Sequence, residues 1–290
     1  MEKVNSLREL TLKKQLWRND GFTWGFVPTM GALHEGHASL IRAAAAENEI
    51  VVVSIFVNPT QFNDPEDFKK YPLTPDSDCQ IAEAAGATVL FTPTAEDIYG
   101  GHIEAQAVDY GRLTTAFEAA ERPGHFDGVV AVVDRLFRAV EPSVAYFGEK
   151  DLQQVAVVRR LAAERHPAVR IACQPLVRDH DGLALSSRNV RLMPEARQRA
   201  LAIAKTLAEV KGEVLAGRDV QAAVAEGRAK LEGVEGLDLA YFEAIETDTF
   251  QTQFAPPHAE SHLICAATVD GVRLIDNIRL TPRPEPAIVP

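Results

Sequence analysis

Cysteine is scarce in this sequence, and long apolar runs are absent. The 290 residues include three cysteines, Cys79, Cys173 and Cys265, which lie far apart and cannot all pair with one another. Few cysteines without a pairing pattern are typical of a reducing compartment, so we expect a cytoplasmic protein. No stretch approaches the roughly 18 consecutive apolar residues that a membrane-spanning helix needs. Residues 1–17 carry charges throughout, unlike a signal peptide, and we expect no membrane partner.

Positive charge is also in short supply. Lys and Arg total 30 against 41 Asp and Glu, which gives a formal net charge of −11. This sign opposes general attraction to a phosphate backbone, so we expect no nucleic-acid partner. A local basic pocket can still bind a small anion, because the net charge does not describe the lining of one cleft. The length, with 46% hydrophobic and 24% charged residues, favours two domains or one large α/β core with an appendage.

Residues 1–177 alternate helical patterns with apolar, β-branched runs. An amphipathic helix with Leu7, Leu10, Leu12 and Leu16 opens the chain. Helices interleaved with fully apolar strands are typical of a parallel sheet covered on both faces, a Rossmann-like α/β fold whose ligands bind beyond the carboxyl ends of the strands. The predicted strands are 22–27, 50–57, 88–91, 143–147 and 169–172, and the predicted helices are 37–48, 79–85, 126–139 and 152–164.

The pattern changes after residue 177. Two helices with polar faces are predicted first, and three β-like runs follow, the last two joined by a hairpin turn at Asp270 and Gly271. The helices are 194–215 and 220–231, and the runs are 239–245, 262–269 and 272–280. We therefore predict a smaller C-terminal α+β domain at 178–290, after a Rossmann-like domain at 1–177.

The most informative segment is 28–37, Pro-Thr-Met-Gly-Ala-Leu-His-Glu-Gly-His, at the end of the first strand. Gly31 and Gly36 let the backbone approach a ligand, and the helix that begins here offers free N–H groups to an anion. His34 and His37 add ring donors. No P-loop and no dinucleotide-binding glycine motif occurs in the sequence. A zinc site and a capped helix start with two solvent-facing histidines are the alternatives.

Two later segments carry further anion-binding groups. Lys150 follows the strand 143–147 in a Gly-Glu-Lys-Asp turn, where lysine acts as a point charge for phosphate. Ser186, Ser187 and Arg188 lie in a flexible stretch of the kind that closes over a polyphosphate. The alternatives are a solvated helical turn for the first segment and a serine-capped turn for the second.

Residues suited to an organic substrate or a metal follow the second strand. Asn58 and Gln61 can hold a hydroxyl or carboxylate group. Downstream, Asp76 and Asp78 supply two carboxylates that can hold Mg²⁺, directly or through water. Capping of the helix that begins there is the alternative, and for Asp76 we rank it above metal binding.

Together these segments resemble the pantothenate synthetase family, the pantoate:beta-alanine ligases of the nucleotidyltransferase superfamily. The similarity covers nearly the whole chain and extends into the second domain at Arg273-Leu274-Ile275-Asp276-Asn277. Leu73, where relatives commonly carry arginine, and Ala119, where glycine is common, depart from the family pattern outside its core motifs. The motifs that carry the resemblance are 28–37, 58–62, 122–126, 147–154 and 181–189.

The resemblance implies a two-step reaction that makes a precursor of coenzyme A. ATP and pantoate form pantoyl adenylate and pyrophosphate, and the amine of beta-alanine then displaces AMP to give pantothenate. His37 is implied as a proton donor, with His34 beside it at the phosphates, and Lys150, Ser186, Ser187 and Arg188 are implied as further catalytic residues. The implied ATP-binding residues are Met30, Gly31, Ala32, Leu33, His34, Glu35, Gly36, His37, Gly148, Glu149, Lys150, Asp151, Val177, Leu185, Ser186, Ser187 and Arg188.

The resemblance also implies the other ligands and the assembly. Gln61 would contact pantoate and later beta-alanine, Gln154 would contact pantoate, and Asn58 would do so more weakly. Mg²⁺ would accompany ATP near Asp76 and Asp78. The chain would form a homodimer, with the C-terminal domain as a lid.

Two other functions remain open at this point. One is a nucleotidyltransferase that keeps the nucleotide on its product, such as a relative of phosphopantetheine adenylyltransferase, and the other is a nonenzymatic nucleotide-binding or regulatory protein. Free AMP that depends on an acid and an amine distinguishes the ligase from the first, and pantoate-dependent release of pyrophosphate distinguishes it from the second. The negative net charge disfavours a tRNA synthetase.

Overall fold

The computed structural model describes residues 1–63, 65–253 and 261–281. The chain divides into two compact units, Met1–Val177 and Arg178–Pro290, and each is described by itself below. Among the described residues, no helix combines the length and the apolarity that crossing a membrane requires.

The first unit contains a six-stranded parallel sheet with the strand order β1-β4-β3-β2-β5-β6. From β2 the chain builds outward through β3 and β4, and it then returns to place β5 against the other side of β2, with Phe26 opposite Ala145. The direction of winding therefore reverses between β2 and β5, the point where open α/β sheets bind their ligands. The strands are β1 (Glu2–Val4), β2 (Trp24–Thr29), β3 (Ile50–Ile55), β4 (Val89–Phe91), β5 (Val144–Gly148) and β6 (Arg170–Gln174).

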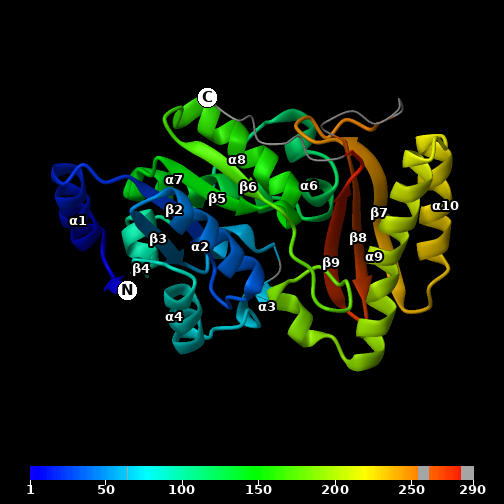
Figure 1. Cartoon of the computed structure of the whole chain (residues 1–290), viewed down its shortest axis with the longest axis horizontal. Coiled ribbons are helices and arrows are strands. Elements are labelled where there is room, and N and C mark those ends of the chain that lie inside the picture. Colours follow the sequence, from blue (N-terminus) through cyan, green and yellow to red (C-terminus); the bar gives the residue numbers. More distant parts are fainter. Residues whose placement is uncertain (64, 254–260, 282–290) are drawn as a thin grey trace. The chain divides into compact units, whose positions relative to one another are not determined.

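Helices cover both faces of this sheet (Figure 1). On one face, Ile41 of α2 and Ala82 of α4 share an apolar core with Val27 and Val53. On the other face, the ring of Phe137 in α7 meets Phe26 edge-on, with 6.5 Å between ring centroids. The helices are α1 (Leu7–Asn19), α2 (Glu35–Glu47), α3 (Pro65–Lys69), α4 (Pro75–Ala84), α5 (Ala95–Tyr99), α6 (Glu118–Glu121), α7 (His125–Val140) and α8 (Leu152–Arg165), with 3₁₀ turns η1 (Pro59–Gln61), η2 (Gly111–Thr114) and η3 (Glu149–Asp151).

The prediction of a parallel sheet with helices on both faces is confirmed, although the short elements β1, α3, α5 and α6 were not predicted. The short edge strand β1 was not predicted, because three residues carry no usable alternation and the strand exists only through pairing with β4. The apolar face expected for α1 was right for Leu10 and wrong for Leu12 and Leu16. Leu12 and Leu16 are exposed, whereas Leu10, Lys14 and Trp17 are buried.

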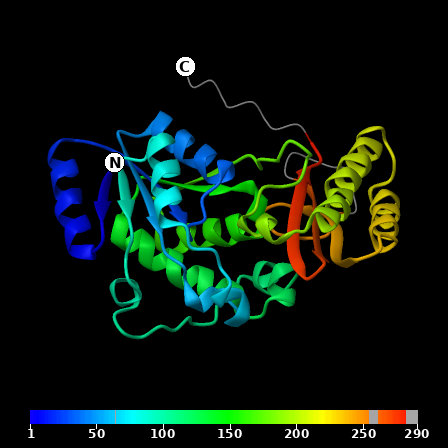
Figure 2. The same ribbon diagram turned by 90° about the horizontal axis from the view of Figure 1, so that it is seen from below.

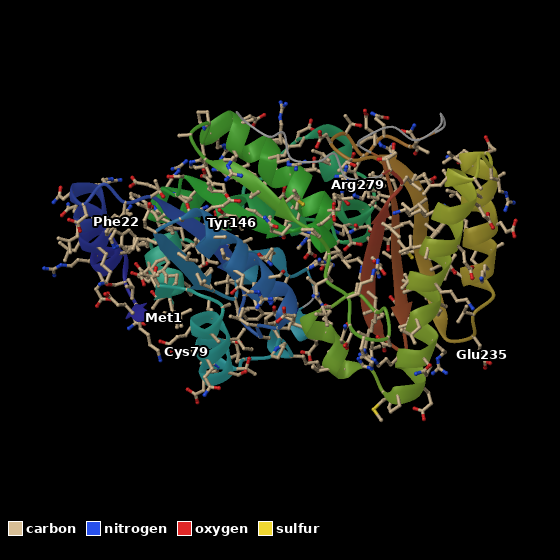
Figure 3. The ribbon with its side chains drawn as sticks, viewed as in Figure 1. Met1, Phe22, Cys79, Tyr146, Glu235 and Arg279 are labelled. Atoms are coloured by element: carbon tan, nitrogen blue, oxygen red, sulfur yellow. The ribbon has the colours of Figure 1, made fainter. Side chains whose placement is uncertain are left out.

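Lys14 can be buried because its charge is compensated. Its ammonium group donates to the carbonyl of Ala139 at 2.6 Å and to the carboxylate of Glu141 at 2.9 Å. Such pairing is the condition on which a charged group is tolerated in a protein interior. Tyr146 on β5 is likewise buried, and its hydroxyl donates to the carboxylate of Glu47 at 2.9 Å (Figure 3).

The second unit has an antiparallel sheet of three strands, β7 (Leu237–Glu246), β8 (Ser261–Val269) and β9 (Val272–Arg279). Helices α9 (Pro194–Leu215) and α10 (Val220–Glu232) pack on one face of it, as Figure 2 shows, and η4 (Ser187–Arg191) precedes them. Asp270 and Gly271 both have positive φ, 46° and 78°, as a tight turn between two strands requires. The α+β architecture predicted for this part of the chain is confirmed.

Candidate active site

The segment after β2 is held in place by a carboxylate. Both oxygens of Asp78 accept backbone N–H groups, from Ala32 at 3.0 Å and from Leu33 at 2.7 Å, and Oδ1 also accepts the hydroxyl of Thr74 at 3.0 Å. Gly31 has φ +82°, and a Cβ atom there would lie 3.0 Å from Oδ2 of Asp78. A buried carboxylate on α4 therefore shapes the segment that leads into α2.

Backbone N–H groups of this segment fix the tautomers of its two histidines. His34 is the N-cap of α2, and its Nδ1 accepts the N–H of Gly36 at 3.1 Å. The backbone N–H of His34 donates to Nδ1 of His37 at 3.3 Å, and the ring centroids lie 4.2 Å apart. Since Nδ1 is an acceptor in both neutral rings, both carry their proton on Nε2. Among the described residues, neither Nε2 group has a hydrogen-bond partner.

Gly36 is needed for a reason that the sequence did not reveal. A Cβ atom at this position would lie 2.9 Å from Cε1 and 3.0 Å from Nδ1 of His34. The backbone angle is that of an ordinary helix, so the requirement is close approach of the imidazole and not a left-handed conformation.

Lys150 lies in η3, directly after β5, on the other side of the point where the winding reverses. Burial, and then the positive charge of Lys150, lower the pKa of His34 to about 4. Burial and the neighbouring His34 lower the pKa of His37 to about 3. The charge of Lys150 also lowers this pKa, and the charge of Asp151 raises it. The structure thus brings together His34, His37, Lys150 and Asp151, and both imidazoles are neutral hydrogen-bond donors at neutral pH.

Asn58 and Gln61 also lie together. Asn58 is 1% exposed, and its amide donates to Gln61 Oε1 and to the carbonyl of Gly128 while its oxygen accepts Tyr99 and Thr60 hydroxyls. These contacts use its hydrogen-bonding capacity. Asn58 thus contacts the side chain of Gln61, and the weak substrate contact expected for Asn58 stays a prediction.

The backbone of Gln61 is fixed by His125, which lies in the motif 122–126 and was assigned no role from the sequence. Nδ1 of His125 donates to the carbonyl of Gln61 at 2.8 Å, and Nε2 accepts from Arg122 at 3.2 Å. Burial first, and then Arg122, lower the pKa of His125 to about 4. One turn further along α7, a Cβ atom on Gly128 would lie 2.2 Å from the carbonyl oxygen of Thr60, so only glycine fits there.

The side chain of Gln61 reaches back to the segment after β2, where its Nε2 lies 2.9 Å from the sulfur of Met30. Gln154 is half-buried in the first turn of α8. Its neighbour Gln153 is buried, and its side chain binds only the backbone, at Leu113, Ala116 and Glu118. Of these adjacent glutamines, Gln153 therefore holds the backbone together inside the core, and Gln154 is accessible from outside it.

The remaining predicted ATP-binding residues lie in or next to the second unit. Val177 is half-buried at the end of the first unit. In the second unit Ser186 is the N-cap of η4, where its hydroxyl accepts the N–H of Arg188 at 3.3 Å. Ser186, Ser187 and Arg188 are all half-buried, unlike a fully solvated turn.

The described residues hold no group of three His, Cys, Asp or Glu side chains suited to a metal ion. Asp76 is exposed in the first turn of α4, and the two oxygens of Asp78 accept the hydrogen bonds given above. Within the described part of the chain, the two carboxylates predicted for Mg²⁺ do not belong to a group of three such side chains, and their metal role stays a prediction. Of the two family departures, Leu73 is exposed and Ala119 lies in α6.

Fold and site together define an α/β protein with histidine and lysine donors for an anion at the reversal point of its parallel sheet. A family model described as Pantoate-beta-alanine ligase matches residues 1–279. The chain belongs to this family, and it is therefore a ligase.

Relatives and solved structures agree. The pantothenate synthetase of Bacteroides fragilis is 43% identical over 281 residues, covering 96% of this chain and 99% of that protein. That of Corynebacterium glutamicum strain R is 46% identical over 266 residues, covering 88% and 93%. The crystal structure of pantothenate synthetase from Thermus thermophilus has a TM-score of 0.89 and 38% sequence identity to this chain, and the match covers 97% of this chain and 100% of that one. The ligase from Francisella tularensis, crystallised with beta-gamma ATP and beta-alanine, is 32% identical, with a TM-score of 0.78 over 98% and 100%.

Proposed function

We propose that this ligase joins pantoate to beta-alanine in two steps at the site around His34, His37 and Lys150. A carboxylate oxygen of pantoate attacks the α-phosphorus of ATP, and the bond from that phosphorus to pyrophosphate breaks. The amine nitrogen of beta-alanine then attacks the acyl carbon of pantoyl adenylate, the bond to AMP breaks, and the nitrogen loses a proton. The observation that carries the proposal is the cluster of neutral histidine donors and a lysine at the reversal point of the sheet.

In the first step two anions meet while negative charge moves onto the departing pyrophosphate. Preorganised donors offset this repulsion, and they act most strongly where water is excluded. The Nε2–H groups of His34 and His37 donate to phosphate oxygens, and Lys150 supplies a point charge. The pKa values of both histidines lie well below 7. His37 therefore acts in the free enzyme as a neutral hydrogen-bond donor, whereas the family resemblance implied a proton donor.

The remaining nucleotide contacts are proposed as they were predicted. The segment after β2 contacts the nucleotide, η3 contacts it after β5, and Ser186, Ser187 and Arg188 of the second unit bind its triphosphate. The proposed ATP-binding residues are Met30, Gly31, Ala32, Leu33, His34, Glu35, Gly36, His37, Gly148, Glu149, Lys150, Asp151, Val177, Leu185, Ser186, Ser187 and Arg188.

Gln61 is proposed to hold pantoate and then beta-alanine, and Gln154 to hold pantoate. The support for Gln61 is its fixed backbone, bound by His125 and Arg122, and its side-chain contact with Met30 next to the nucleotide segment. A backbone held from two sides places the amide with little loss of conformational entropy on binding.

Three finer assignments complete the proposal. We propose that Mg²⁺ accompanies ATP through the phosphate oxygens, since Asp78 is already bonded to the backbone. We propose a cytoplasmic location, supported by the scarcity of cysteine, with three in 290 residues. We also propose a homodimer, on the resemblance to the family.

The experiment that tests the reaction is exchange of labelled pyrophosphate into ATP. Exchange that requires pantoate but not beta-alanine supports the adenylate, and addition of beta-alanine should then release AMP and pantothenate in equal amounts. Exchange without pantoate, or an accumulating product that retains the nucleotide, would contradict the proposal.

A further inference from the structure

The sequence Arg273–Asn277 on β9 was singled out by resemblance, and no catalytic step uses it. Within the second unit, Asp276 is 5% exposed and binds the guanidinium of Arg178 through two hydrogen bonds, of 2.8 and 2.9 Å. The same guanidinium donates to the carbonyl of Asn277 at 3.1 Å and to that of Gly182 at 3.0 Å. Arg178 therefore ties β9 to residue 182 by four hydrogen bonds.

Residues 178–184 form a small hairpin that leads directly into the predicted triphosphate segment. Arg178 pairs with Ala184 in an antiparallel bridge, and the N–H of Asp179 donates to the carbonyl of Leu183 at 2.8 Å. The carbonyl of Ala184 accepts the side-chain amide of Asn189, in η4, at 2.9 Å. The position of this hairpin thus determines the start of the segment that contains Ser186, Ser187 and Arg188.

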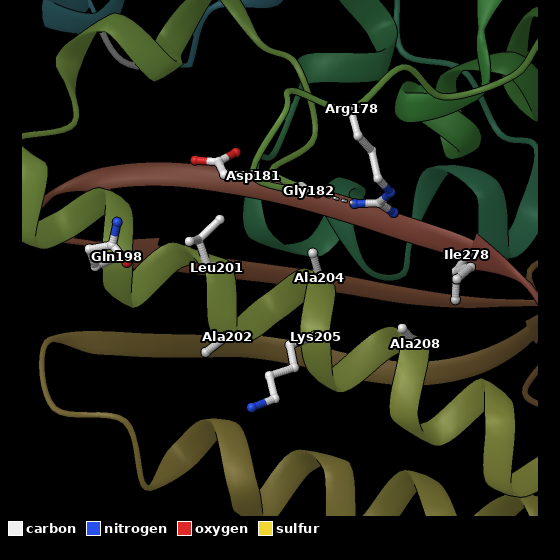
Figure 4. Close-up of a pocket in the computed structure, with 10 residues that line it drawn as sticks. All are labelled: Arg178, Asp181, Gly182, Gln198, Leu201, Ala202, Ala204, Lys205, Ala208 and Ile278. Carbon is white, nitrogen blue, oxygen red and sulfur yellow. Dashed lines mark hydrogen bonds between the residues drawn. The ribbon is translucent and has the colours of Figure 1, made fainter.

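At the tip of the hairpin His180 is exposed, and Asp181 and Gly182 are half-buried. A cavity of about 660 Å³ lies beside it, lined by Asp181 and Gly182 on one side and by Leu201 and Lys205 of α9 on the other (Figure 4). Arg197 crosses from α9 to bind Asp181 at 2.8 Å. The arginines add these polar contacts to the apolar packing of Leu183, which is 3% exposed in the core of the second unit.

We propose that Arg178 and Asp276 are positioning residues for ATP: the pair fixes the 178–184 hairpin, and through it the placement of Ser186, Ser187 and Arg188 at the triphosphate. The inference rests on the proposed function of these three residues. Bidentate pairing suits the role, because the planar fork of arginine restricts orientation as well as distance. A lysine in place of Arg178 keeps the charge and loses the fork.

The test compares Asp276→Asn and Arg178→Lys with a matched control. Asp270→Asn removes the carboxylate of another arginine–aspartate pair of the second unit, Arg199–Asp270, in which the aspartate is exposed and lies outside the hairpin. We expect kcat/KM for ATP to fall about 100-fold in the Asp276 and Arg178 variants, as for a misplacement on the order of 1 Å. The KM values for pantoate and beta-alanine should stay within about twofold of wild type, by the same reasoning that only ATP contacts move.

A second variant separates positioning from stability. Replacing both partners, Arg178→Met with Asp276→Leu, leaves no buried charge unpaired and should restore the thermal midpoint. If the pair only stabilises the fold, ATP turnover recovers with stability and the inference is wrong. If ATP turnover stays low in the stable double variant, the positioning role is supported.

Arg188→Ala distinguishes the inference from the assignment on which it rests. If Arg188→Ala leaves kcat/KM for ATP unchanged, the proposed triphosphate role of the segment fails. If Arg188→Ala impairs ATP turnover while Asp276→Asn does not, only the anchoring role of the Arg178–Asp276 pair fails.

Discussion

The backbone N–H of His34 donates to Nδ1 of His37 at 3.3 Å. A backbone N–H cannot accept a proton, so Nδ1 of His37 must be unprotonated and the ring must carry its proton on Nε2. The contact therefore sets the tautomer of the residue proposed to donate to ATP, in the way that a hydrogen bond to one ring nitrogen determines the role of the other.

This relationship predicts opposite results for two amides at position 37. In His37→Asn the amide replaces Nδ1, so the contact with His34 is kept and the Nε2–H donor is lost. In His37→Gln the amide reaches the position of Nε2, and the donor is kept. We expect pantoate-dependent pyrophosphate exchange to fall about 100- to 1,000-fold in the Asn variant, the usual cost of one preorganised donor, and substantially less in the Gln variant. Equal loss in both, at unchanged thermal midpoints, would argue against donation from Nε2.

Lys150→Ala removes a point charge next to the two imidazoles. We expect a loss of transition-state stabilisation of about 2.7 to 4 kcal/mol, or a 100- to 1,000-fold lower rate of adenylate formation. Single-turnover formation of pantoyl adenylate is the direct measurement. Lys230→Ala, at an exposed pair with Glu209 in the second unit, is the control and should behave as wild type. Wild-type exchange in Lys150→Ala would reject the assigned role.

Asp78→Asn should weaken the segment after β2. Asparagine has one acceptor oxygen where the carboxylate has two. Its NH₂ group would therefore face the backbone N–H of either Ala32 or Leu33, and neither group can accept a hydrogen bond from the other. We expect the free energy of unfolding to fall by about 2 kcal/mol, typical of a lost hydrogen bond to a charged group, and the KM for ATP to rise. Urea unfolding and initial-rate kinetics measure the two effects.

Asp76→Asn is the matched control for this prediction, since Asp76 is exposed on the same helix. It should leave both quantities unchanged. A variant of Asp78 with wild-type stability and an increased requirement for Mg²⁺ would instead support the metal role first predicted for these two carboxylates.

The pH dependence of stability should reflect His125, which is 8% exposed with a pKa lowered to about 4 by burial and then by Arg122. Below pH 6.5 the unfolded chain binds a proton at this ring that the folded chain does not. The free energy of unfolding is therefore fully retained above pH 6.5 and falls toward pH 4, by about 1.4 kcal/mol per pH unit for this residue.

Replacing His125 with asparagine isolates this contribution. The asparagine amide can still donate to the carbonyl of Gln61, as Nδ1 does, but it does not titrate. Urea unfolding at pH 7.5, 6.5 and 5.5 should show a shallower loss of stability in the variant than in wild type. Parallel pH profiles for the two proteins would show that His125 is not held neutral by the fold.

Much of the fold could be predicted because its signals are local. The run Ile50–Ile55 is almost entirely β-branched and apolar, and it forms β3 as expected for a strand buried on both faces. Asp270 and Gly271 tolerate positive φ, and they make the predicted turn. The helix predicted over 37–48 is present as α2, which begins at Glu35 after its N-cap His34.

Contacts between distant residues could not be predicted. Asp78 was considered as a metal ligand or a helix cap, and its bonds to Ala32 and Leu33 depend on α4 packing beside the end of β2. His125 supports Gln61 from another helix. The buried face of α1 follows from which side of the helix packs against the rest of the first unit, and the leucine pattern placed Leu10 on it correctly but not Leu12 and Leu16.

The sequence by itself determined the alternation of strands and helices, the position of each anion-binding group next to a strand end or a helix start, and the change of pattern after residue 177. Only the tertiary structure decided that β5 lies beside β2, and this brings Lys150 to His34 and His37. The physical reason is that backbone hydrogen bonds between parallel strands are available to any apolar run. The strand order is chosen by side-chain packing across the whole sheet, which no local pattern contains.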